Sequence, residues 1–131
     1  YESRLHSADA ILLIASVLSN GKLNDFINLA KSYSMDCLVE INNEEELGRV
    51  LGSDADIIGI NNRNLNTLKI DTETTINLMN RIPNDKIVVS ESGISSKEYL
   101  KKISGRVNAV LVGTFFMNSG DLEMGMQSLI K

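Results

Sequence analysis

Polar side chains that could take part in chemistry stand in or directly after short apolar runs of the chain. Glu40 lies inside the run Leu38–Ile41, Asn61 follows a second run, and Glu91 and Ser92 follow a third. A carboxylate in an apolar strand is costly unless it is paired or functional, and carboxylates held in this way often serve as general acids or bases. The pattern predicts a site role for Glu40, with a structural ion pair or a solvent-facing edge position as the alternative.

Two strand ends carry glycine and hydroxyl residues that suit an anion. The fourth apolar run ends in Ser90–Ile94, which contains Gly93, and the fifth is followed by Gly113 and Thr114. Glycine lets the backbone approach a ligand closely, and neighbouring backbone amides receive an anion. Either glycine alone is ordinary after a strand, but together, on what would be the last two strands of a barrel, they predict a phosphate site.

A third polar segment, Asn61–Asn64, follows the run Ile57–Ile60 and contains Arg63. Its amide and guanidinium groups offer several hydrogen-bond donors. Asparagine is also common in loops because it tolerates turns, so a binding segment and an ordinary loop are equally consistent with these residues.

The chain is poor in the residue types that a soft metal site needs. It has one cysteine, Cys37, and one histidine, His6, which leaves no intrachain disulfide and no obvious metal set. We expect a buried small side chain at Cys37, because an apolar run follows it, and a solvated side chain at His6. Neither a metal nor a cofactor is expected.

The charge and the hydropathy of the chain argue against nucleic acid and membranes as partners. The 131 residues include 13 Lys plus Arg against 17 Asp plus Glu, a formal net charge of -4 with a pI near 5.0, which provides no general attraction for nucleic acid or anionic lipid. The longest apolar stretch, Ala10–Ala15, is far shorter than the ~20 residues of a membrane-spanning helix, and no basic-then-apolar leader opens the chain. We therefore expect a cytoplasmic protein without nucleic-acid or membrane partners.

Two kinds of segment alternate along the chain and would position the polar residues. Short apolar runs rich in Val and Ile, spaced by roughly 20–30 residues, are typical of parallel strands buried on both faces and joined by helices. The runs are Ala10–Ala15, Cys37–Ile41, Ile57–Ile60, Ile87–Val89 and Ala109–Val112. Ligands of such folds bind at the carboxyl ends of the strands, where the polar residues stand.

The segments between the runs have helical period and helix caps. Apolar residues share one helical face in two of them: Leu23, Phe26, Ile27 and Ala30 in the first, and Ile76, Leu78 and Met79 in the second. Asn43 with Glu46, and Ser95 with Glu98, have the spacing of an N-terminal cap. These segments are the expected covering helices.

About five βα units are compatible with a complete doubly wound sheet or with part of an eight-unit barrel. Tyr1–Ser7 has the character of a helix end that leads directly into the run at Ala10, which favours a chain that begins within a larger fold. A (β/α)8 barrel typically takes ~250 residues. The sequence therefore predicts an α/β fold, a partial (β/α)8 TIM barrel of about five parallel βα units, in which residues 1–131 form the C-terminal portion and the N-terminal strands are absent.

Several segments resemble the indole-3-glycerol phosphate synthase family, in the family's order and at its spacing. The most specific are IGINNRNL at Ile58–Leu65 and VSESGI at Val89–Ile94, and the weaker ones are Ala8–Ile14, Leu38–Glu40 and Val110–Gly113 with Met117. The resemblance covers nearly the whole chain and implies the barrel from the end of the third helix through the eighth. It implies an enzyme of tryptophan biosynthesis that closes the pyrrole ring of 1-(2-carboxyphenylamino)-1-deoxyribulose 5-phosphate, with loss of carbon dioxide and water.

The resemblance also implies roles for the polar residues. Attack of an electron-rich aromatic carbon on a carbonyl needs a general acid for the carbonyl oxygen and a base for the ring proton. The expected catalytic residues are Glu40, Asn61, Glu91 and Ser92, and the expected substrate and phosphate ligands are Arg63, Gly93, Gly113 and Thr114.

The chain departs from the family pattern in ways that bear on activity. The family's catalytic lysines, including the general acid, and a further glutamate lie on the first three strands, and no lysine of this chain matches those motifs. Asn42 stands where the family commonly has His, and Thr114 occupies a variable position. We expect the chain to be inactive alone. The alternatives are a domain that binds a phosphorylated ligand without turnover and a half-barrel that self-associates through the open edges at Ala10 and Ala109.

Overall fold

A computed structural model describes residues 1–130, and its centre is one parallel sheet of five strands. All five predicted strands are present, with ends within one or two residues of the predicted ones. They are β1 (Ala10–Ile14), β2 (Asp36–Ile41), β3 (Ile57–Asn61), β4 (Ile87–Glu91) and β5 (Ala109–Leu111). They lie in the sheet in chain order, and every neighbouring pair is parallel.

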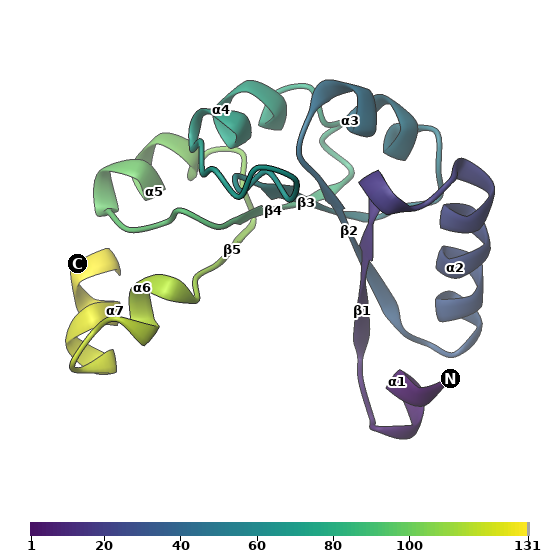
Figure 1. The fold of residues 1–131 in the computed structure, drawn as a ribbon, viewed down its shortest axis with the longest axis horizontal. Coiled ribbons are helices and arrows are strands. Elements are labelled where there is room, and N and C mark those ends of the chain that lie inside the picture. The colour runs from purple at the N-terminus through teal and green to yellow at the C-terminus, as the bar shows by residue number, and fades with distance from the viewer. Residues whose placement is uncertain (131) are drawn as a thin grey trace.

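Helices alternate with these strands along the chain. They are α1 (Glu2–Leu5), α2 (Asn20–Ser32), α3 (Glu44–Leu51), α4 (Glu73–Met79), α5 (Lys97–Ile103), α6 (Thr114–Met117) and α7 (Leu122–Ile130), with a 3-10 turn at Ala15–Val17. Figure 1 shows the strands as a curved arc, and α2 to α5 cover one side of the sheet, along the outside of the arc. The short α1 agrees with the helix end expected before the first strand.

The order of the strands decides between the two predicted architectures. A doubly wound sheet has helices on both faces and a point at which the strand order reverses. Here the order is β1-β2-β3-β4-β5 without a reversal, and α2 to α5 follow one side of the arc (Figure 1). The chain is therefore a partial TIM barrel of parallel βα units, as predicted.

The core lies between the sheet and the helices on its outer side. Val39, Ile58 and Val88, one from each of the three central strands, are completely buried and belong to one apolar cluster with helix residues such as Ile27. Cys37 is buried in the same cluster, as predicted, and this burial raises the pKa of its thiol. Burial of branched apolar side chains on this side is the main force that holds the helices on the sheet.

The prediction that the strands are buried on both faces is wrong for the edge strands and for part of the inner face. All of β5 is exposed, and Leu12 of β1 and Ile87 of β4 are 49% and 46% exposed. The physical reason is that β1 and β5 each have only one neighbouring strand, while the helices α2 to α5 cover the opposite side (Figure 1).

The helices follow the predicted pattern with two corrections. Phe26 shares the predicted face of α2 but is 40% exposed, because it lies at the border of the buried stripe. The cap of α5 is Ser96, whose hydroxyl accepts from Tyr99 N at 3.2 Å, instead of Ser95. The predicted cap of α3 is confirmed, since Asn43 Oδ1 accepts from Glu46 N at 2.9 Å.

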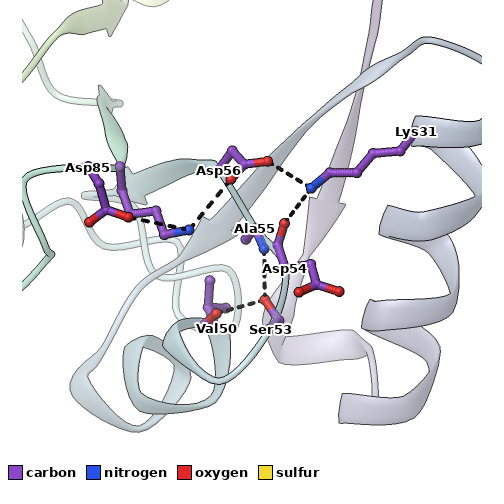
Figure 2. A network of polar contacts seen from close by, with 8 residues as sticks. Lys31, Val50, Ser53, Asp54, Ala55, Asp56 and Asp85 are labelled. Carbon is purple, nitrogen blue, oxygen red and sulfur yellow. Dashed lines mark hydrogen bonds and ion pairs between the residues drawn. The ribbon is translucent and has the colours of Figure 1, made fainter.

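A surface network of ion pairs joins elements at the amino ends of the strands (Figure 2). Lys31 Nζ, near the end of α2, lies 2.8 Å from Asp56 Oδ2 and 2.9 Å from Asp54 O, and Lys86 Nζ lies 3.5 Å from Asp56 Oδ1. The bond from Lys31 holds the pKa of Asp56 below its usual value. Because Lys31 and Asp56 are exposed and Lys86 is half-buried, the network contributes little to stability and its contribution falls with salt.

Ile58→Val should lower the free energy of unfolding by about 1 kcal/mol, since it removes a methylene group from a fully buried side chain. The same substitution at Ile87, which is 46% exposed, should have a much smaller effect. Urea denaturation of both variants at low protein concentration measures the difference. Equal losses at the two positions would show that the inner face is covered in solution, against the arrangement described here.

Candidate active site

A cavity of about 690 Å³ opens at the carboxyl ends of β4 and β5. Its lining is Arg63, Ile70, Glu91, Ser92, Gly93, Ile94, Ser95, Leu111, Val112, Gly113, Thr114, Phe115, Asn118 and Ser119. This set contains six of the eight residues expected to carry function: Arg63, Glu91, Ser92, Gly93, Gly113 and Thr114. The parallel sheet brings them together because all strands end at the same edge.

The other two expected residues, Glu40 and Asn61, lie at the carboxyl ends of β2 and β3 and are each 6% exposed. Glu40 lines a separate cavity of about 40 Å³. Asn61 Oδ1 accepts from Arg63 N at 2.8 Å, so in this structure the Asn61 amide shapes the turn that carries Arg63. Neither residue lines the large cavity.

Two buried carboxylates face each other across a glycine on the inner face of the sheet. Glu40 of β2 pairs with Gly59 of β3 in the strand register, and Asn61, two residues further on, pairs with Glu91 of β4. A Cβ atom on Gly59 would overlap Glu91 Oε1 and lie 3.1 Å from Glu91 Cδ. The glycine therefore provides the space in which the Glu91 carboxyl group lies.

Glu91 holds its proton far more tightly than an ordinary glutamate. Burial, and then the nearby charge of Glu40, raise the pKa of Glu91 from 4.5 to about 7, and Glu91 Oε1 is buried without a hydrogen-bond partner among residues 1–130. Because the folded pKa lies above the unfolded one, stability falls as pH rises from 4.5 to about 7, and the full cost remains above pH 7. A carboxyl group with such a pKa can donate or accept a proton near neutral pH.

The turn after β4 has an uncommon backbone. Ser92 and Gly93 have φ values of 64° and 72°, in the left-handed region that favours glycine. A Cβ atom on Gly93 would also lie 2.5 Å from Ile70 Cγ2. The backbone conformation at position 93 therefore favours glycine, and an added Cβ would force the Ile70 side chain to move.

Gly113 differs from Gly93 because no protein atom lies within 4 Å of the position that its Cβ would take. It precedes α6 and lines the same cavity. Among residues 1–130, the backbone amides of Gly93, Gly113 and Thr114 donate to no other protein group. These amides, together with the Thr114 hydroxyl, are available to an anionic ligand.

Two residues that shape the site were not singled out in the sequence. Gly59 interrupts the apolar run Ile57–Ile60, and a glycine inside a strand often marks a close approach of another group, so a signal for it was present. Asn62 was treated as part of a polar segment. It is in fact 1% exposed and bonded to four neighbouring residues, which its sequence position does not indicate.

The side chains of residues 1–130 include no cluster of three His, Cys, Asp or Glu that could hold a metal ion. In the same part of the chain, no helix combines the length and the apolar character that crossing a membrane requires.

Comparison with known protein families gives one clear match. The family model described as indole-3-glycerol phosphate synthase matches residues 1–129. The indole-3-glycerol phosphate synthase of Acetivibrio thermocellus is 54% identical over 126 residues, which are 94% of this chain and 48% of that protein. That of Endomicrobium trichonymphae is 45% identical over 130 residues, 98% of this chain and 50% of that protein.

The chain spans about half the length of these curated relatives. A protein of Buchnera aphidicola named tryptophan biosynthesis protein TrpCF is 45% identical over 130 residues, which are 99% of this chain and 29% of that protein.

Solved structures with low sequence identity share the fold. A mandelate oxidase variant with an FMN adduct superimposes with a TM-score of 0.68 at 15% identity, over 98% of this chain and 49% of that one. The YdjI aldolase of Escherichia coli gives 0.62 at 12% identity, over 98% and 57%. At these identities the likeness concerns the fold alone.

Gly59→Ala should push the Glu91 carboxyl group out of its buried position and lower its pKa from about 7 toward the ordinary value of 4.5. The reason is that the new methyl group takes the space of Glu91 Oε1, and solvation favours the charged form. Titration of the Glu91 side-chain carboxyl carbon by NMR measures the change.

The matched control is Gly48→Ala in α3, where no atom lies within 4 Å of the added Cβ. It should leave the Glu91 titration unchanged and, in a helix, should stabilise the fold by up to about 1 kcal/mol. A Glu91 pKa that stays near 7 in the Gly59→Ala variant would contradict the role given to this glycine.

Proposed function

Because the chain belongs to the indole-3-glycerol phosphate synthase family, we propose that it forms the C-terminal half of the active site of such an enzyme. The reaction is the ring closure and decarboxylation of 1-(2-carboxyphenylamino)-1-deoxyribulose 5-phosphate. The observation that carries the proposal is the cavity at the strand ends, in which residues for an anion and a buried carboxyl group lie side by side.

The phosphate of the substrate would bind at the end of the cavity formed by Gly93, Gly113 and Thr114. Their backbone amides are free to donate, and the Thr114 hydroxyl adds a further donor. The space beside Gly113 is open to a ligand. Arg63, on the same cavity, would attract the remaining negative charge of the substrate.

The carboxylates would handle protons during ring closure. The aromatic carbon attacks the carbonyl carbon, the carbonyl oxygen takes a proton, carbon dioxide and water leave, and a base removes a proton to complete the indole. Glu40 and Glu91 are close enough for one charge to raise the pKa of the other, which supports a role for both in proton transfer. Ser92 and Asn61 would orient the sugar and anthranilate portions.

The cationic proton donor that the family resemblance implies would come from outside this chain. Glu91 can exchange a proton near neutral pH, but within residues 1–130 no lysine lines the cavity. The buried groups that do line it can bind and orient the substrate, but the loss of a general acid alone costs about 10²–10⁴-fold in rate. We therefore propose that activity requires the other half of the barrel.

A second candidate function is binding of a phosphorylated ligand without turnover. The cavity has its free amides and Arg63 whether or not a proton donor is present. Ligand binding therefore does not depend on catalysis. We expect a sugar phosphate as the ligand, and we keep as predictions a cytoplasmic location and the absence of nucleic-acid and membrane partners.

The chain alone should produce no indole glycerol phosphate, and mixing it with the separately expressed N-terminal half of the Acetivibrio thermocellus relative should restore production. Glu91→Gln in the mixture should lower the rate by about 10²–10⁴-fold, because the carboxyl group can no longer exchange a proton. Indole fluorescence follows the product.

The control for this experiment is Asp56→Asn in the surface network at the opposite ends of the strands, which should leave the rate of the mixture unchanged. Product formation by the chain alone would sink the proposal. Binding of inorganic phosphate by a mixture that never turns over would favour the second candidate.

We also propose that the chain self-associates through its inner face and open strand edges. Leu12 and Leu111 are 49% and 50% exposed on β1 and β5, and both strands have a free edge. Unpaired backbone groups beside exposed apolar side chains favour pairing with another chain. The expected partner is a second copy.

Sedimentation at protein concentrations on the order of tens of micromolar should detect a dimer or larger species. Leu12→Asp should shift the population toward monomer, because it places a charge on the face to be buried. Leu51→Asp, a change at a 38% exposed position on α3, is the control and should leave the assembly intact. A stable monomer of the unmodified chain would count against self-association.

A further inference from the structure

We infer that Asn62 is a positioning residue that holds the Ser92–Gly93 turn in its left-handed conformation and thereby keeps the proposed phosphate site in shape. The inference rests on the proposed function for its link to phosphate, and on the geometry alone for its link to the turn. Asn62 follows β3 directly and is 1% exposed. It lies beside the buried polar side chains of Thr75 and Ser90 and does not line the cavity.

The Asn62 side chain hydrogen-bonds to residues of the turn after β4 and of the helices α4 and α5. Its Nδ2 donates to Ser92 O at 2.9 Å and to Tyr99 OH at 3.1 Å. Its Oδ1 accepts from Thr75 N at 3.1 Å and from Thr75 Oγ1 at 2.9 Å. One amide group therefore connects the turn after β4 with the starts of α4 and α5.

The orientation of this amide is determined by its partners. Thr75 N can only donate a hydrogen bond, so the Asn62 Oδ1 atom must face Thr75. Ser92 O can only accept one, so the Asn62 Nδ2 atom must face Ser92. Thr75 and Ser90 are both completely buried, and their hydroxyl oxygens lie 2.8 Å apart. Such a network is costly to disrupt, because any member that loses its partner stays buried and unsatisfied.

The turn needs a support of this kind. Ser92 has a φ of 64°, a conformation that is unfavourable for a residue with a side chain unless its surroundings hold it. The bond from Asn62 to Ser92 O acts on the peptide unit that joins Ser92 to Gly93. Gly93 N, which belongs to that same peptide unit, is one of the free amides proposed for phosphate.

Tyr99 extends the support to the far side of the turn. Its hydroxyl accepts from Asn62 and donates to Thr72 O at 3.2 Å. Thr72 precedes α4, and its Cγ2 would lie 3.2 Å from a Cβ at Gly93. The network therefore reaches the turn from β3, α4 and α5 at once, and Asn62 is the side chain common to these paths.

Asn62→Asp in the 131-residue chain is the sharpest test, because it changes one atom. The carboxylate keeps the acceptor for Thr75 and replaces the donor to Ser92 O with an oxygen that repels it. We expect the amide resonances of Gly93 and Ile94 to shift and the coupling that reports φ at Ser92 to change. The dissociation constant for inorganic phosphate should rise on the order of tenfold.

Thr75→Val is the second variant, in case a buried aspartate prevents folding. It removes the hydroxyl that holds Asn62 Oδ1 without touching the turn, and it should move the Ser92 and Gly93 signals in the same direction by a smaller amount. The matched control is Asn108→Ala, which removes the acceptor for Val88 N, 2.8 Å away at the amino end of β4. This control should lower stability while leaving the turn and phosphate binding unchanged.

The inference is overturned if the Ser92 and Gly93 signals of a folded Asn62→Asp or Thr75→Val variant match those of the unmodified chain. It is also overturned if Asn108→Ala shifts them equally, since the effect would then be general. Failure of the unmodified chain to bind phosphate would count against the proposed phosphate site only. The NMR signals of Ser92 and Gly93 test the positioning role of Asn62 independently of phosphate.

Discussion

Parallel pairing of consecutive strands is the constraint on which the rest of the structure depends. After each strand the chain must cross back to the amino end of the sheet before the next parallel strand can begin. A helix makes that crossing. Because the returning helices all lie along the outer side (Figure 1), the carboxyl ends of β1 to β5 gather at one rim. Glu91 and Gly113 are 22 positions apart in the sequence and line one cavity for this reason.

The same constraint separates the residues that stabilise the fold from the residues of the candidate active site. The apolar cluster beneath the helices contains fully buried residues such as Ile58 and Val88, and the exposed ion pairs of Lys31 and Asp56 join elements at the amino ends (Figure 2). The carboxyl ends hold groups that are unfavourable for folding. They include the buried Glu91 Oε1, which has no hydrogen-bond partner among residues 1–130, and two consecutive left-handed residues. Costs of this kind are typical of sites whose geometry serves a ligand.

Much of this arrangement could be predicted because local patterns report it directly. Apolar runs located all five strands, and the polar residues that end them located six of the cavity residues. The patterns could not report contacts between residues far apart in the sequence. The exposure of Leu12 depends on what lies beside β1, and the burial of Asn62 depends on partners from α4 and α5. The need for a glycine at position 59 depends on the Glu91 side chain of the next strand.

The chemical role of Glu91 depends on what faces its free oxygen. Burial, and then the charge of Glu40, raise its pKa to about 7, so it can serve as an acid or as a base near neutral pH. A cationic side chain brought to the inner face would offset both effects and lower this pKa. Glu91 would then be a carboxylate, suited to accept a proton, while the cation itself could donate one. A cation placed there would therefore change which group is the acid and which is the base, without any movement of the residues already in place.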